Sequence, residues 1–209
     1  MNDGHDHKEH EGVGPGAEAG YHATRIRAME ELLIAKGVLT KEDVRRQIEY
    51  MEARTPANGA RLVARAWVDP GFKARLLSDT KAAALELGID ASVPVEFVVV
   101  ENTPEVHNLI VCTLCACYPR AILGRPPDWY KSFNYRSRAV KEPRAVMREI
   151  GLEPPDDVEV VVHDSTADVR YMVLPMRPSG TGGMSEEELA ELVTRDSLIG
   201  VSAAREPAS

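Results

Sequence analysis

The stretch Val111-Cys112-Thr113-Leu114-Cys115-Ala116-Cys117-Tyr118-Pro119 holds all three cysteines of a 209-residue chain within six positions. Such a cluster is typical of a metal site or a redox site. We call residues 112–117 the cysteine claw. A metal held by Cys115 and Cys117 would lie beside the main-chain nitrogens of Ala116 and Cys117, which could complete a square of two sulfurs and two nitrogens. Cys112 could add an axial sulfur, and the open sixth position would be that of a catalytic site.

Three other interpretations of the cluster stay open on spacing alone. A zinc site would need a fourth ligand, which His107 or His163 could supply. Alternatively, the three cysteines could be buried and pack as small apolar residues. A disulfide is the poorest interpretation, because an odd number of cysteines leaves one thiol over and the loops would be very short.

The residues around the claw resemble the metal-binding subunit of the nitrile hydratase family, which includes thiocyanate hydrolase. The likeness rests on Cys112 to Pro119 and on Leu-Gly-x-Pro-Pro-x-Trp-Tyr-Lys at residues 123–131. It extends from about Leu32 to Val201, through Ala66–Pro70, Glu101–Thr103, Tyr135–Arg138 and Leu192–Asp196.

This resemblance implies one Co(III) ion per subunit, or alternatively Fe(III), held by the sulfurs of Cys112, Cys115 and Cys117 and the main-chain nitrogens of Ala116 and Cys117. Thr113 resembles the cobalt type. The resemblance also implies oxidation of Cys115 to sulfinic acid and Cys117 to sulfenic acid. The implied enzyme is a carbon–oxygen lyase that adds water to a metal-bound nitrile to give an amide. The Cys117 sulfenate would act beside the substrate as nucleophile or base.

The resemblance implies partners as well. A beta-type subunit would supply arginines to the oxidised cysteines, in a heterodimer or heterotetramer, and a metallochaperone or activator would load the metal. The substrate would be a small nitrile or thiocyanate. Trp129 is a further candidate at the substrate pocket, although packing in an aromatic core explains it equally well.

Two departures from the family pattern affect the predicted catalysis. Ala116 replaces the usual serine, so the amide donor stays but a hydroxyl is lost, and we expect altered turnover. Arg120 and Arg125 replace residues that are usually uncharged in nitrile hydratases, and Arg120 resembles thiocyanate hydrolase. Their charges would favour an anionic substrate. The alternative function is therefore a gamma-type thiocyanate hydrolase subunit, which converts thiocyanate to carbonyl sulfide and ammonia. A non-catalytic, metal-binding structural subunit is an alternative of another class.

Composition excludes several classes of function. The net charge of −8 disfavours a nucleic-acid partner, and no apolar run approaches the length of a membrane span. The amino terminus is acidic and His-rich instead of basic and then apolar, so no secretory signal is visible. Together with reduced thiols, this pattern predicts a cytoplasmic protein.

We predict an α+β fold in which a helical N-terminal arm precedes a layered α-β-β-α domain that carries the claw. Residues 1–20 are expected to form a disordered His-rich tail. Residues 21–90 form the helical N-terminal segment, and residues 91–209 form an α/β metal-binding catalytic domain.

The expected elements follow from periodicity and capping signals. Helical spacing predicts helices over residues 23–36, 40–54, 61–67, 70–77, 80–87, 135–140 and 143–150. A final helix follows the capping pair Ser185 and Glu188 and runs through Val193. Valine-rich runs predict strands over residues 95–100, 106–111, 158–162 and 170–174. Residues 125–135, rich in proline and aromatic side chains, are expected to wrap the claw.

Overall fold

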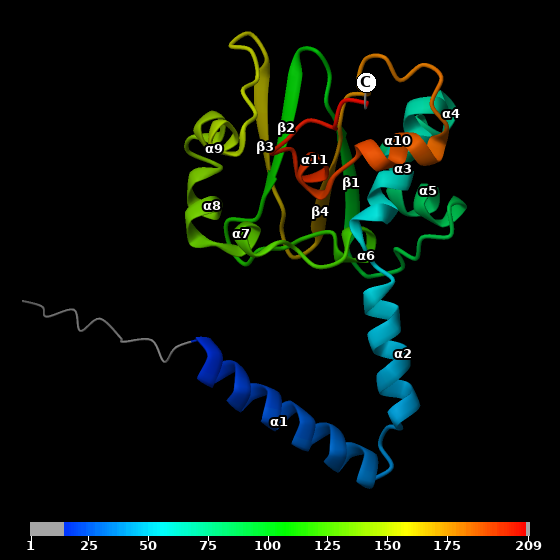
Figure 1. The fold of residues 1–209 in the computed structure, drawn as a ribbon, viewed down its shortest axis with the longest axis vertical. Coiled ribbons are helices and arrows are strands. Elements are labelled where there is room, and N and C mark those ends of the chain that lie inside the picture. The colour runs from blue at the N-terminus through cyan, green and yellow to red at the C-terminus, as the bar shows by residue number, and fades with distance from the viewer. Residues whose placement is uncertain (1–14, 208–209) are drawn as a thin grey trace, which may run out of the picture. The chain divides into compact units, whose positions relative to one another are not determined.

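The computed structural model describes residues 15–207, so residues 1–14 of the predicted tail lie outside the described residues. The predicted mixture of helices and strands is confirmed (Figure 1). The helices are α1 (Pro15–Ala35), α2 (Lys41–Glu52), α3 (Pro56–Val68), α4 (Pro70–Ser78), α5 (Thr80–Glu86), α6 (Arg120–Leu123), α7 (Asp128–Lys131), α8 (Phe133–Arg138), α9 (Pro143–Ile150), α10 (Glu186–Leu192) and α11 (Arg195–Ile199). The strands are β1 (Glu96–Glu101), β2 (Val106–Val111), β3 (Glu159–Asp164) and β4 (Val169–Leu174).

The chain divides into two compact units, one ending at Tyr50 and the other beginning at Met51. The first unit contains α1 and most of α2, and α1 already includes residues 15–20 of the predicted tail. The second unit contains the claw and all four strands. The predicted segment 21–90 spans both units, because α3, α4 and α5 bury side chains in the same core as the strands. The three predicted domains remain a prediction.

In the first unit, apolar side chains stay on the surface. Ile26, Met29 and Leu32 of α1 are all more than half exposed, at 65%, 59% and 55%. α2 has no buried residue at all. These helices therefore bury little of their apolar surface within the chain. None of the helices among residues 15–207 is long and apolar enough to cross a membrane.

The four strands of the second unit form two parallel pairs. β1 pairs with β4 in the register Glu96↔Val169, and β2 pairs with β3 in the register Val106↔Glu159. Parallel strands are usually covered on both faces. Figure 1 shows the strands between α8 and α9 on one side and α3, α4, α5 and α10 on the other. The register places the last residue of β2, Val111, opposite the last residue of β3, Asp164.

Two asparagines join the two strand pairs where β1 turns into β2. The amide nitrogen of Asn108 donates to Oδ1 of Asn102 at 2.8 Å, and Nδ2 of Asn108 donates to the carbonyl of Glu101 at 2.8 Å. Both asparagines are buried. Buried amide groups need such partners, so these contacts fix the start of the strand that leads to the claw.

Helix α3 begins five residues earlier than the predicted residue 61. Thr55 precedes Pro56, a residue suited to the first helical position, but Gly59 makes the same stretch resemble a loop. The structure shows why a glycine stands there. A Cβ at position 59 would collide with Leu123 and would lie 2.9 Å from a methyl carbon of Leu198. Close packing against α6 and α11 therefore requires Gly59, and neither short helix was predicted.

Candidate metal centre

The claw starts in the core, reaches the surface in its middle and is partly buried at its end. β2 leads directly into it, and the carbonyl of Val111 accepts a hydrogen bond from the amide of Ser165 at 2.7 Å. Cys112 is fully buried, Cys117 is partly buried and Cys115 is exposed. Solvent therefore reaches the predicted site at Cys115 and, in part, at Cys117.

The three sulfurs converge. The Sγ atoms of Cys115 and Cys117 are 3.0 Å apart, those of Cys112 and Cys115 are 3.8 Å apart, and all three lie within 4.8 Å of one another. With metal–sulfur bonds of about 2.3 Å, two sulfurs at a right angle are about 3.3 Å apart and at a tetrahedral angle about 3.8 Å. The Cys115–Cys117 separation is nearer to that of neighbouring corners of a square, and the Cys112–Cys115 separation equals the tetrahedral value. The three sulfurs are close enough to bind one metal ion together, as the sequence predicts.

Ala116 is the one residue other than glycine with a positive φ, 63°, among residues 15–207. The left-handed conformation costs a residue with a Cβ about 1–2 kcal/mol. Such strain is concentrated at functional sites. Here it occurs at the residue between Cys115 and Cys117, whose sulfurs lie together, and so it supports the predicted chelating tripeptide.

Main-chain N–H groups of the claw lower the pKa of the Cys112 thiol. Burial works to raise the pKa of the Cys112 thiol, but the amide N–H groups of Cys115, Cys117 and Leu114 outweigh it, so the pKa lies below its ordinary value. The Cys115 amide donates to this sulfur at 3.3 Å. Because the thiolate is the form that binds metal, Cys112 is prepared as a ligand. In contrast, burial and the neighbouring thiols raise the pKa of Cys117 to about 12.

Asp164 holds the claw from β3, a role that the sequence did not reveal. One carboxylate oxygen accepts the amide of Thr113 at 2.9 Å, and the other accepts the Thr113 hydroxyl at 2.6 Å. The contact exists because Asp164 is opposite Val111 in the parallel register. Carboxyl ends of neighbouring parallel strands often form sites, but only knowledge of the pairing would have identified this one.

Within the predicted wrapping segment 125–135, Tyr130 contacts the claw and Tyr135 contacts the strand before it, and Arg136 just beyond the segment contacts the claw as well. The hydroxyl of Tyr130 donates to the Cys117 carbonyl at 2.9 Å, and that of Tyr135 donates to the Ile110 carbonyl at 2.6 Å. Nη1 of Arg136 donates to the carbonyls of Thr113 and Leu114 at 3.2 and 3.1 Å. That the whole segment wraps the claw stays a prediction.

The other predicted catalytic residues, Trp129 and Arg120, occupy different settings. Trp129 packs edge-on against Tyr135, with ring centroids 4.8 Å apart, and lines a pocket with Arg138 that includes none of the cysteines. Arg120, at the start of α6, and Arg125 are exposed. The roles of Trp129 and Arg120 in catalysis stay predictions.

The structure does not support the three other interpretations of the cluster. Nε2 of His107 donates to the Gly200 carbonyl at 2.7 Å, and Nε2 of His163 lies 2.7 Å from Oδ1 of Asn108. Among the described residues, no histidine belongs to the group formed by the cysteines. All three thiols are free, and Cys115 is exposed, so neither a disulfide nor a buried apolar cluster is formed.

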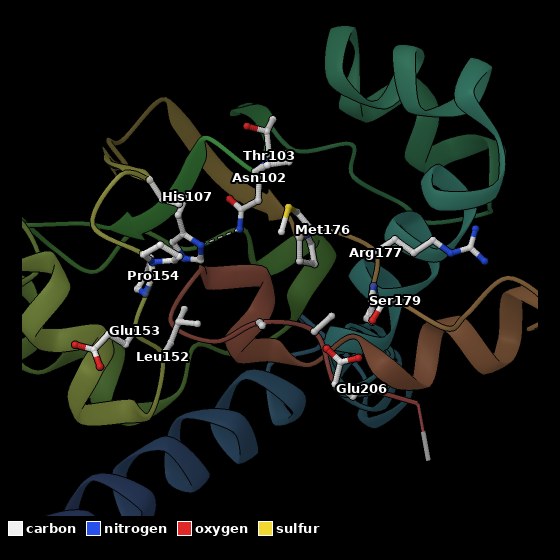
Figure 2. A pocket seen from close by; sticks show the side chains of 17 residues that line it. Asn102, Thr103, His107, Leu152, Glu153, Pro154, Met176, Arg177, Ser179 and Glu206 are labelled. Atoms are coloured by element: carbon white, nitrogen blue, oxygen red, sulfur yellow. Dashed lines mark hydrogen bonds between the residues drawn. The ribbon is translucent and has the colours of Figure 1, made fainter. Parts of the chain in front are cut away.

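A pocket of about 560 Å³ lies at the other end of β2 (Figure 2). Figure 2 shows His107 pointing toward Asn102, whose amide nitrogen is 3.3 Å from Nδ1 of the imidazole. Arg177, at its edge, donates to the hydroxyl and the carbonyl of Thr181. Its walls are largely proline and aliphatic side chains, and these polar groups are paired internally. The reactive groups are therefore those of the claw.

The similarity to known proteins covers the claw and the residues around it. The family described as "Nitrile hydratase, alpha chain" matches residues 20–202. The alpha subunit of the low-molecular-weight cobalt-containing nitrile hydratase of Rhodococcus rhodochrous is 51% identical over 186 residues, which cover 88% of this chain and 90% of the relative.

Two further proteins show how far the similarity extends. The gamma subunit of thiocyanate hydrolase from Thiobacillus thioparus is 44% identical over 186 residues, covering 84% of this chain and 76% of that subunit. A solved double mutant of the Fe-type nitrile hydratase from Comamonas testosteroni Ni1 matches with a TM-score of 0.82 at 46% identity. That match covers 90% of this chain and 92% of the solved chain.

Proposed function

We propose a function for this chain, which belongs to the nitrile hydratase alpha-chain family: it is the metal-binding catalytic subunit of a nitrile hydratase. The enzyme adds water across a nitrile C≡N bond to give an amide. One observation carries the proposal, namely the convergence of three sulfurs around the left-handed residue Ala116. The family match includes the whole claw.

The cofactor is one cobalt(III) ion, with iron(III) as the alternative, as in the cobalt-containing and Fe-type relatives. Its ligands are the sulfurs of Cys112, Cys115 and Cys117 and the main-chain nitrogens of Ala116 and Cys117. When bound, such an ion supplies Lewis acidity toward a nitrile or water. The protein contributes a rigid frame, because Asp164 orients the claw through Thr113.

We infer the state of each sulfur from the family resemblance, which implies a sulfinic acid at Cys115, a sulfenic acid at Cys117 and a thiolate at Cys112. The exposure of the residues supports this inference, because Cys112 is fully buried and Cys115 and Cys117 are accessible. The Cys117 oxygen then acts beside the substrate as nucleophile or base.

A beta-type subunit completes the site, with arginines that bind the oxidised sulfurs in a heterodimer or heterotetramer. Exposed apolar side chains support such a partner: Leu114 in the claw is 86% exposed and Phe133 is 78% exposed. The apolar side chains of α1 offer further contact area. A metallochaperone or activator loads the metal in the cytoplasm, where the thiols stay reduced until then.

Thiocyanate hydrolysis is the second candidate, and Arg120 favours it. This exposed arginine is three residues from Cys117, and the thiocyanate hydrolase gamma subunit is similar over most of its length. The chain, produced with its beta-type partner, should be tested with acrylonitrile, benzonitrile and thiocyanate. Faster hydration of the nitriles supports the main proposal, and faster release of ammonia from thiocyanate overturns it.

Elemental analysis with mass spectrometry of the 112–117 peptide distinguishes a catalyst from a structural metal-binding subunit. Cobalt or iron together with three added oxygens on two cysteines is the result we expect. Zinc with unmodified thiols would instead support the structural alternative.

A further inference from the structure

We propose that Tyr130 is a positioning residue of the metal centre, whose phenol holds the Cys117 end of the claw in the geometry that binds metal. The inference rests on the proposed function, because it concerns the same centre. It assigns to the aromatic segment of residues 128–138 a part in metal retention as well as packing.

The Tyr130 side chain is held by burial, by ring contacts and by one hydrogen bond. The residue is fully buried, and its ring packs edge-on against Tyr118 with centroids 5.2 Å apart. A second edge contact joins it to Trp129, with centroids 6.1 Å apart. The hydroxyl donates to the Cys117 carbonyl at 2.9 Å. A packed ring cannot move away, so the carbonyl that it binds is also held.

Cys117 is the residue at which such a contact has most effect. It follows Ala116, whose left-handed backbone is the strained point of the claw. In the proposed centre, Cys117 supplies two donors, its sulfur and its nitrogen. Fixing its carbonyl limits rotation of the residue and thereby the directions of both donors.

Tyr135 offers a matched control from the same segment. It is also buried, and its hydroxyl donates to a main-chain carbonyl, that of Ile110, at 2.6 Å. Ile110 lies on β2 and supplies no ligand. Removing either hydroxyl breaks the same kind of bond in the same kind of environment, but only Tyr130 binds a ligand residue. A purely structural role predicts equal effects on the centre.

The experiment compares Tyr130→Phe and Tyr135→Phe in the cobalt-loaded complex with the beta-type partner. The readouts are the rate of cobalt loss to an excess of chelator and the sulfur-to-cobalt charge-transfer absorption. We expect Tyr130→Phe to lose cobalt roughly 10-fold faster or more, the usual effect of losing a group that supports a ligand, and to shift the absorption. We expect Tyr135→Phe to retain the wild-type values.

Equal rates and unshifted spectra in both variants would overturn the inference. If the wild-type complex holds neither cobalt nor iron, the proposed function itself fails, and if it holds iron, the same rates are measured for iron loss. Should Tyr130→Phe not fold, 3-fluorotyrosine at position 130 decides the matter, because the more acidic phenol is a stronger donor. Slower cobalt loss than wild type would then support the proposal, and an unchanged rate would contradict it.

Discussion

The two ends of β2 are both polar, yet they are built in opposite ways. At the start of the strand, the His107 imidazole donates a hydrogen bond to the Gly200 carbonyl and contacts the Asn102 amide, beside the pocket in Figure 2. At the end of the strand, the thiols of Cys115 and Cys117 are accessible, and among residues 15–207 they bind no acceptor outside the claw.

This difference shows where chemistry can occur. Polar groups that satisfy one another stabilise a fold but have little left to offer a ligand. At the claw, surrounding residues such as Asp164 and Tyr130 bind the main chain and leave the sulfurs available. These hydrogen bonds fix the main chain of the claw, and its sulfur atoms stay available to bind metal.

Removing a proposed metal ligand is the strongest test of the difference between the two ends of β2. We expect Cys112→Ser to lower cobalt affinity by more than about 100-fold, beyond the usual cost of losing a supporting group, because the buried thiolate is lost. His107→Gln, at the other end of β2, should keep full cobalt loading. Elemental analysis after gel filtration measures both. Equal loss of cobalt in the two variants would show that the ends are not independent.

A second test weakens the hydrogen bonds that orient the claw and leaves every proposed ligand in place. Asp164→Asn removes the charge that accepts two hydrogen bonds from Thr113. We expect roughly 10-fold weaker cobalt retention, typical for a group that orients a metal site. Chelator competition measures the change. Asp168→Asn, at an exposed carboxylate of the next turn, is the control and should behave as wild type.

A substitution at Ala116, the residue with the left-handed backbone, should have a smaller effect. Ala116→Ser adds a hydroxyl without changing the main-chain donor, so we expect unchanged cobalt content and an altered, higher turnover of nitriles. Steady-state kinetics and metal analysis check both parts. A rate equal to that of the wild type would remove the hydroxyl from the account of catalysis.

The smallest effect is expected at the start of β2, where the polar groups hydrogen-bond to one another. Burial lowers the pKa of His107, so the folded chain disfavours its protonated form. Its contribution to stability is therefore present above the ordinary pKa of about 6.5 and is lost as pH falls below that value. The loss is at most about 1.4 kcal/mol per pH unit for one group. Urea unfolding of the metal-free chain between pH 7.5 and pH 5.5 should show a shallower pH dependence in His107→Gln.

Much of the local structure could be predicted from the sequence, because its signals are local. The strand over 106–111 has the predicted bounds, and the capping box of Ser185 and Glu188 is present at the predicted helix start. The claw could also be predicted, since its three cysteines lie within six residues of the chain.

What could not be predicted depends on pairing between distant segments. Asp164 reaches Thr113 only because β3 lies parallel to β2 in one register. Tyr130 belongs to an aromatic run that a sequence does not distinguish from ordinary core. Gly59 resembles a loop residue until its contacts with α6 and α11 are known. These side chains gain their roles from neighbours that no short pattern encodes.

The register of β3 also limits how the length of this chain can vary. Successive residues of a strand face opposite sides of the sheet, so inserting or deleting one residue between Glu159 and Asp164 would turn the carboxylate away from Thr113. The turn that follows, closed by the amide of Thr166 and the carbonyl of Val169, lies beyond that carboxylate. Changes in residue number are therefore tolerated in the turn but excluded from the strand, even where side chains within the strand are free to differ.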